Sequence, residues 1–295
     1  MDISFDMTGK EKRFDWNQLI RRIRHPIPET LTNFTNGTIG DPIVLLHGLG
    51  ASSYSWRYLT PVLGEDYQTI EFDLLGFGSS PKPGNTTYSI YDQAALVINY
   101  IKEQGLNNVS LVGHSFGGGV ALVIAAYFET TAPGLVKKLV LIGSIGCRQE
   151  PPWFIRLLRI PLIPRILGYF VPPSFNAKTM LKVAFFDRSK ITLEMVRAYA
   201  KPGHEAAARS AIIETAKQIQ PDDLDKLIEK YNDIDVPTLL IWGRQDRIVP
   251  MKIGEELHTL LSNSNLHIVD NCGHLPHEEK PELVIPLIHA FLNQP

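Results

Sequence analysis

Short apolar runs that alternate with helical patterns are the feature of this sequence that most restricts its fold. The runs are rich in Val, Ile and Leu on both faces, as in parallel strands that helices cover on each side. The expected strands are 42–47, 67–73, 109–113, 136–143, 236–243 and 265–270, and the expected helices are 54–63, 90–104, 116–128 and 281–293. This alternation predicts an α/β fold with a mostly parallel sheet covered by helices on both faces.

The alternation breaks once, between about residues 146 and 230. This stretch has only helix-like segments and proline-rich joints. A segment of that length is too long for a bare connection between two strands. We therefore expect a helical cap over residues 146–230, inserted into an α/β core made of residues 1–145 and 231–295.

The first part of the expected cap, residues 151–173 (PPWFIRLLRIPLIPRILGYFVPP), is apolar and basic and contains no acidic residue. We expect a lid whose apolar face roofs the active site, with the arginines reaching solvent and with Trp153, Phe154 and Leu157 contacting substrate. The alternative is that this lid exposes apolar surface for acyl chains or makes weak contact with an anionic membrane surface. Its internal prolines interrupt any long interfacial helix and favour the roof.

The N-terminal region gives two weaker signals. Residues 14–24 (FDWNQLIRRIR) predict a short amphipathic helix that ends before Pro26. Asn36–Gly37 is a turn sequence typical of a β-hairpin.

Composition excludes several classes of protein. The 29 basic and 31 acidic residues give a net charge of −2, which does not suit nucleic-acid binding. Two cysteines do not make a disulfide framework. The first residues lack a signal-peptide pattern, and no apolar run is long enough to span a bilayer. We therefore expect a cytoplasmic protein with no integral membrane segment, either a monomer or a homodimer.

The strongest local motif is Gly113-His114-Ser115-Phe116-Gly117, placed between an expected strand and an expected helix. A serine on a sharp strand-to-helix turn projects its hydroxyl away from the sheet, and the turn needs small residues on both sides. The start of the helix also directs free N–H groups toward an oxyanion formed there. Ser115 is therefore the candidate nucleophile.

A serine nucleophile needs a base, and the base needs an orienting carboxylate. His274 follows the last expected strand, in a loop that reaches the carboxyl edge of the sheet, where catalytic groups of α/β sheets gather. His277 is its only serious rival. Asp246 follows the strand that ends near Trp242, and a salt bridge with a neighbouring arginine is its structural alternative. Asp73, in contrast, is expected to hold a glycine-rich turn.

The oxyanion needs two backbone donors. One is the N–H of Phe116, directly after the nucleophile. The second is expected from Leu49, in the sequence His47-Gly48-Leu49-Gly50 that follows the first buried strand.

Five segments in this order, PIVLLHGLG, DLLGFGSS, LVGHSFGG, LLIWGRQDRIVP and NCGHLPHEEKP, resemble the α/β-hydrolase superfamily over about residues 41–145 and 231–295. The resemblance implies a Ser115–Asp246–His274 triad, a cap after the sixth strand, no metal and no organic cofactor. It also implies an N-terminal hairpin, for which no pattern is found before residue 30.

Departures from subfamily patterns narrow the activity. Haloalkane dehalogenases and epoxide hydrolases have Asp in place of Ser115. Meta-cleavage-product hydrolases keep the serine but usually have Trp where this chain has Leu275, and their Gly/Pro-rich first oxyanion loop is missing here. We expect a carboxylic-ester hydrolase whose small-molecule substrate has a hydrophobic acyl or aromatic part. The alternatives are a carbon–carbon bond hydrolase and a slow-turnover ligand receptor on the same fold.

Overall fold

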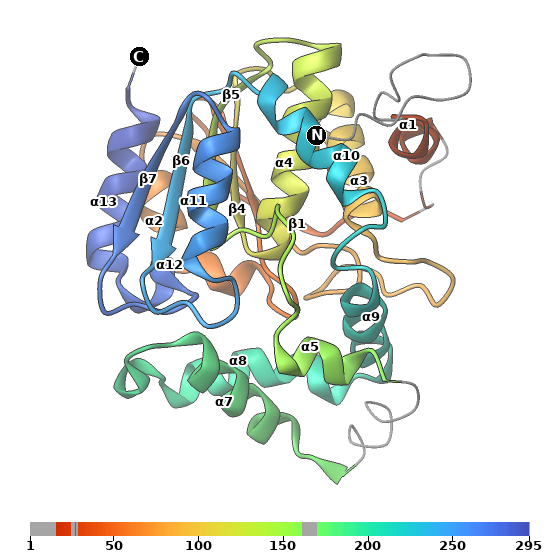
Figure 1. Ribbon diagram of the computed structural model, residues 1–295, viewed down its shortest axis with the longest axis vertical. Helices are drawn as coiled ribbons and strands as arrows, with labels where there is room; N and C mark the ends of the chain where they lie inside the picture. Colours follow the sequence, from red (N-terminus) through yellow and green to blue (C-terminus); the bar gives the residue numbers. More distant parts are fainter. Residues whose placement is uncertain (1–15, 25–26, 28, 161–169, 295) are drawn as a thin grey trace, which may run out of the picture.

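The computed structural model describes residues 16–24, 27, 29–160 and 170–294. Its centre is a seven-stranded sheet in the order β1-β3-β2-β4-β5-β6-β7 (Figure 1). The strands are β1 (Asn33–Asn36), β2 (Pro42–Leu46), β3 (Gln68–Phe72), β4 (Val109–His114), β5 (Val136–Ile142), β6 (Thr238–Gly243) and β7 (Ser264–Val269). All neighbours pair in parallel except β1, which is antiparallel to β3 at the edge. The predicted α/β-hydrolase fold is confirmed, and each of the six expected strands lies within two residues of its predicted bounds.

Helices cover both faces of this sheet because the strands are apolar on both faces. Along β2, Val44 and Leu46 point to one hydrophobic cluster, while Ile43 and Leu45 point to the other. The first cluster includes side chains of α1 (Asn17–Arg24), α3 (Ile90–Glu103), α4 (Phe116–Thr131) and α11 (Met251–Leu260). The second includes side chains of α2 (Thr60–Leu63) and α13 (Pro281–Leu292).

The predicted hairpin at Asn36–Gly37 is wrong. These residues do turn the chain from β1 toward β2, but β3 lies between the two strands in the sheet. Gly37 has a φ of +78°, and a Cβ there would stand 2.2 Å from the carbonyl oxygen of Tyr67, just before β3. The turn therefore packs on the start of β3, and β1 takes its hydrogen bonds from that strand.

Two further expectations differ in detail. The expected helix at 54–63 is divided into a 3-10 turn, η1 (Ser53–Trp56), and α2. Pro61 explains the break, because proline is accepted in the first turn of a helix and not in its interior.

The N-terminal helix α1 is present, although the part of the prediction before residue 16 lies outside the described residues. Before β5 the described residues form four strands, so the insertion follows the fifth described strand.

Only helices and turns are described between β5 and β6. They are α5 (Trp153–Leu158), α7 (Pro173–Ala184), η2 (Arg188–Lys190), α8 (Leu193–Ala200), η3 (Lys201–His204), α9 (Ala206–Lys217), α10 (Leu224–Glu229) and η4 (Lys230–Asp233). In Figure 1, α5, α7 and α8 form a layer below the sheet. A short helix, α12 (Pro276–Glu279), precedes α13. Across the residues that the structure describes, no helix has the length and apolar character needed to cross a membrane.

Candidate active site

Ser115 lies at the sharp turn between β4 and α4. Its φ of 52° and ψ of −116° place a non-glycine residue in a strained backbone conformation. The two glycines of the motif make this turn possible. A Cβ at Gly113 would stand 2.6 Å from the carbonyl oxygen of Gly117, and one at Gly117 would stand 2.1 Å from that of Leu46. The spacing of the motif thus follows from close backbone packing around the serine.

His274 and Asp246 meet at the carboxyl edge of the sheet, as predicted. His274 Nδ1 lies 2.7 Å from Asp246 Oδ2, and both side chains are buried. The other carboxylate oxygen, Oδ1, accepts hydrogen bonds from the backbone N–H groups of Ile248 (2.8 Å) and Val249 (2.9 Å). A carboxylate held on both oxygens fixes the ring with its proton on Nδ1, so that Nε2 is left as the acceptor.

The alternative partners do not take these positions. Arg244, which could have paired with Asp246, forms an ion pair with Asp270. Asp73 holds a turn as expected, since its carboxylate accepts from the N–H groups of Ser53 and Ser79, each at 2.7 Å.

Gly143, which directly follows β5, lies against the His274–Asp246 pair. Its φ is +49°, and a Cβ there would lie 3.1 Å from His274 Nδ1 and 3.3 Å from Asp246 Oδ2. Sequence reasoning did not single out this residue. A glycine that directly follows a buried strand at the catalytic edge is the signal that could have found it.

The loop after β2 carries the second expected oxyanion donor. Among the described residues, the N–H groups of Leu49 and Phe116 have no backbone acceptor, so both are available to a ligand. His47 holds the loop in place: its Nε2 accepts from the N–H of Leu74 (3.0 Å), so its Nδ1 donates to the carbonyl oxygen of Gly48 (2.8 Å). Burial lowers the pKa of His47, which keeps the ring neutral for this role.

Ser115 and His274 line one cavity of about 510 Å³, beneath the helices that follow β5. No hydrogen bond joins Ser115 Oγ to His274 in the described part of the chain, and such contacts often tighten only when substrate binds. The oxyanion-loop residues and the three predicted substrate contacts also line the cavity: Gly48, Leu49, Trp153, Phe154 and Leu157. The remaining wall is mostly apolar, and α7 and α9 contribute part of it.

His277 lies behind the acid–base pair. Its ring is fully buried, 4.9 Å from the ring of Trp56 and 4.8 Å from that of His114, and within the described structure neither of its nitrogens has a hydrogen-bond partner. Burial lowers its pKa to about 3, so the ring is neutral and its 3.9 Å approach to Glu278 is not an ion pair. His277 does not line the cavity, whereas His274 does, so His274 is the candidate base.

The loop that carries His274 is fastened on several sides. The carboxylate of Glu279 is buried and accepts from the N–H groups of Gly273 (2.7 Å), Asp187 (2.6 Å) and Phe186 (3.2 Å). His274 donates its own N–H to the carbonyl oxygen of Ala184 at 2.6 Å. Glu279 therefore joins the loop that carries His274 to the residues that follow α7.

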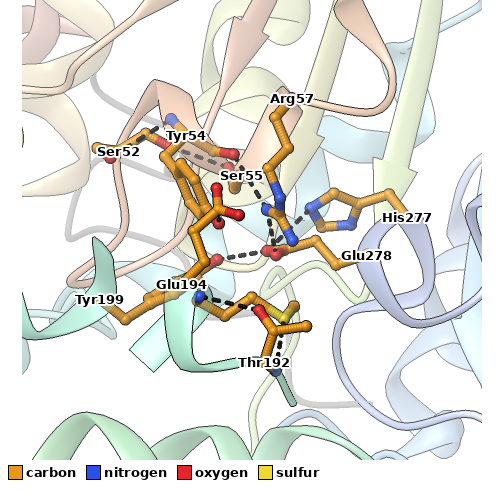
Figure 2. Close-up of polar contacts among 10 residues, drawn as sticks. Ser52, Tyr54, Ser55, Arg57, Thr192, Glu194, Tyr199, His277 and Glu278 are labelled. Atoms are coloured by element: carbon orange, nitrogen blue, oxygen red, sulfur yellow. Dashed lines mark hydrogen bonds and ion pairs between the residues drawn. The ribbon is translucent and has the colours of Figure 1, made fainter. Parts of the chain in front are cut away.

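A second polar network joins the core to α8 (Figure 2). Arg57 Nη1 lies 2.6 Å from Glu278 Oε2, and Tyr199 donates its hydroxyl to the other oxygen of this buried carboxylate. Nearby, the hydroxyl of Tyr54 donates to Glu194 at 3.2 Å. Burial raises the pKa of Glu278, and the Arg57 guanidinium opposes that rise. Because Tyr199 also lines the cavity, this network fixes part of the cavity wall.

Comparison with known proteins places the chain among hydrolases. The model of the alpha/beta hydrolase family matches residues 43–287. An uncharacterized hydrolase, YugF, of Bacillus subtilis is 34% identical over 251 residues, covering 85% of this chain and 89% of the relative. The 2-hydroxy-6-oxo-2,4-heptadienoate hydrolase of Pseudomonas putida is 30% identical, with 88% and 92% covered.

Solved structures agree on the fold. A meta-cleavage product hydrolase from Pseudomonas fluorescens superimposes with a TM-score of 0.76 at 24% identity, covering 90% of this chain and 94% of that one. An esterase from Exiguobacterium antarcticum also gives a TM-score of 0.76, at 22% identity, with 90% and 96% covered. The family match includes Ser115, Asp246 and His274, and the chain belongs to the alpha/beta hydrolase family.

Proposed function

We propose that this protein is a serine hydrolase that cleaves carboxylic esters through an acyl-enzyme on Ser115. The observation that carries the proposal is a strained turn at Ser115 that shares one cavity with His274, whose ring is paired with the buried carboxylate of Asp246. The turn itself does not require a histidine and a carboxylate beside it, so their presence there points to catalysis. The combination of the two is what acyl transfer requires.

The proposed reaction has two steps, acylation of Ser115 and hydrolysis of the acyl-enzyme, and His274 serves in both. Nε2 of His274 takes the proton of Ser115 as the serine oxygen attacks the ester carbonyl, and Asp246 stabilises the imidazolium. The N–H groups of Leu49 and Phe116 bind the oxyanion of the tetrahedral intermediate. His274 then gives its proton to the leaving alcohol. Water, activated by the same ring, hydrolyses the acyl-enzyme.

The apolar cavity supports a hydrophobic acyl or aromatic substrate. We assign residues 146–230 to a cap that roofs it, with Trp153, Phe154 and Leu157 as substrate contacts. An apolar wall excludes water and strengthens the electrostatic interactions of the oxyanion. The enzyme is proposed to act in the cytoplasm as a monomer or homodimer, and its two buried free cysteines suit a reducing compartment.

A panel of p-nitrophenyl esters of increasing acyl length, run beside a meta-cleavage dienone, tests the proposal. We expect turnover of medium-chain esters and a loss of kcat of about 10⁶-fold in Ser115→Ala. An undiminished ester turnover in Ser115→Ala would refute the mechanism. Turnover near zero for every substrate, with ligand-dependent shifts in melting temperature, would instead favour the receptor alternative.

Carbon–carbon bond hydrolysis is the second candidate, because the Pseudomonas putida relative acts on a dienoate by its name. The same serine and base would serve that reaction. Leu275 argues against it, since it occupies the place of the usual tryptophan and packs with Leu181 and Phe185 in the small core of the cap. Faster bleaching of the dienone than of any ester would establish this candidate.

A further inference from the structure

The helices at the far end of the expected cap expose large apolar side chains. Phe170 is 81% exposed, Phe175 is 63% exposed and Trp153 is 52% exposed, and Ile160 is also at the surface. Isolated exposed hydrophobics are ordinary on protein surfaces. The three aromatic residues lie within residues 153–175, and exposed apolar side chains that form a patch mark an interaction site.

The same stretch carries one sign of charge. Residues 151–186 include five Lys and Arg residues and no Asp or Glu, although the whole chain has more acidic than basic residues. Arg156 on α5 and Lys178 and Lys182 on α7 are exposed. Aromatic side chains accompanied by cations match a membrane surface that holds anionic lipid. Aromatic rings favour the interface between headgroups and acyl chains, and Lys and Arg are attracted to anionic headgroups.

Two of the three exposed aromatic residues also border the cavity that contains Ser115. Trp153 and Phe175 are both exposed and both contribute to the wall of the cavity that contains Ser115. Helices α5 and α7, which carry them, lie on the side of the molecule away from the sheet (Figure 1). The apolar cavity therefore reaches the surface at Trp153 and Phe175, on the two helices that also carry the exposed basic residues Arg156, Lys178 and Lys182.

We propose that this face, made of Trp153, Ile160, Phe170 and Phe175 with Arg156, Lys178 and Lys182, docks on an anionic lipid surface. The basic residues attract the protein to the lipid headgroups, and the aromatic residues enter the interface between headgroups and acyl chains. A lipid-borne ester then passes from the bilayer into the cavity without crossing water. This last step rests on the proposed ester hydrolase activity, whereas docking itself does not.

Vesicle sedimentation of the full chain tests docking. Vesicles of phosphatidylcholine are compared with vesicles in which about a third of that lipid is replaced by phosphatidylglycerol. The Ser115→Ala variant is used, so that binding is measured without catalysis. We expect binding to the anionic vesicles only, and weaker binding as salt rises from about 0.1 to 1 M, because the screening length falls from about 10 to 3 Å.

Two variants localise the surface. A triple change of Arg156→Gln, Lys178→Gln and Lys182→Gln removes three charges and is expected to reduce partition onto anionic vesicles about 100-fold. Phe170→Ser is expected to weaken binding and to leave soluble-ester turnover intact, since Phe170 is not part of the cavity wall. The matched controls, expected to bind normally, are Leu283→Ser and the triple change of Lys137→Gln, Lys226→Gln and Lys252→Gln, all at exposed positions outside this face.

The outcomes separate the two proposals. Absence of vesicle binding, equal binding to both kinds of vesicle, or equal loss in the control variants would overturn docking. Concentration-dependent dimerisation that Phe170→Ser abolishes, without vesicle binding, would also overturn it and would assign the face to a second copy of this chain. Turnover of a soluble short ester without vesicles tests the ester hydrolase activity independently of any result on docking.

Discussion

Replacing Gly143 by alanine tests whether the fit around the acid–base pair controls catalysis. The new Cβ would lie 3.1 Å from His274 Nδ1, and ordinary contacts begin near 3.4 Å, so the ring must move by about 0.3 Å. A misplacement of about 1 Å costs roughly 100-fold in rate, so a 0.3 Å shift corresponds to a loss of kcat of about fourfold. The positive φ of Gly143 adds a loss of about 1–2 kcal/mol in the free energy of unfolding.

Gly134→Ala is the matched control for this change. Gly134 also has a positive φ, +83°, but no atom lies within 4 Å of the position of its new Cβ. The control should lose a similar free energy of unfolding in urea and keep the wild-type kcat. Gly143 does not line the cavity, so KM should not change in either variant.

The assay is steady-state hydrolysis of a p-nitrophenyl ester, with urea unfolding of each variant in parallel. Wild-type kcat in Gly143→Ala would refute the reasoning, because the His274–Asp246 pair would then tolerate the contact. The same loss of kcat in both variants would also refute it, since backbone strain alone would explain the effect.

Three further predictions concern single groups. Asp246→Asn should lower kcat about 10⁴-fold with little change in KM, because the amide favours the wrong tautomer of His274; a loss below tenfold in ester kinetics would argue against that role. The free energy of unfolding of His277→Phe, minus that of the wild type, should be about 2 kcal/mol larger at pH 5 than at pH 7.5. The folded pKa of His277 is lowered to about 3, so the unfolded chain binds more protons below about pH 6.5, and wild-type stability falls as pH falls; equal differences at both pH values in urea unfolding would contradict this. Glu279→Ala leaves three backbone N–H groups without an acceptor and should lower the free energy of unfolding by about 3 kcal/mol or more; a change under about 1 kcal/mol in the same assay would show that water replaces the carboxylate.

Local sequence patterns were sufficient to predict the central strands of the sheet and the order of the candidate nucleophile, acid and base along the chain. A buried parallel strand is a continuous apolar run, and the turn after it requires glycine at fixed spacing. Both signals lie within a few residues of each other, as at Gly113–Gly117. Asp246 and His274 were found in the same way, because each directly follows a strand and parallel strands bring their ends to one edge.

Other features depended on contacts between distant segments. The edge strand β1 has only one buried or half-buried residue, and its place beside β3 is decided by pairing across the sheet. His47 accepts a hydrogen bond from Leu74 and Glu279 accepts one from Asp187, residues far away in the sequence, so no local pattern marks the roles of these two side chains. The cavity wall likewise joins residues that are far apart in the sequence, from Gly48 to Leu275.

The sequence by itself determined the fold class and the candidate nucleophile, acid and base, because periodicity and turn chemistry are local properties of the chain. Tertiary structure alone decided that His277 lies behind the site and His274 within it, since burial depends on what packs around each ring. It also decided that part of the apolar segment 151–173 faces solvent, because a segment that is apolar all round does not specify which side the core covers.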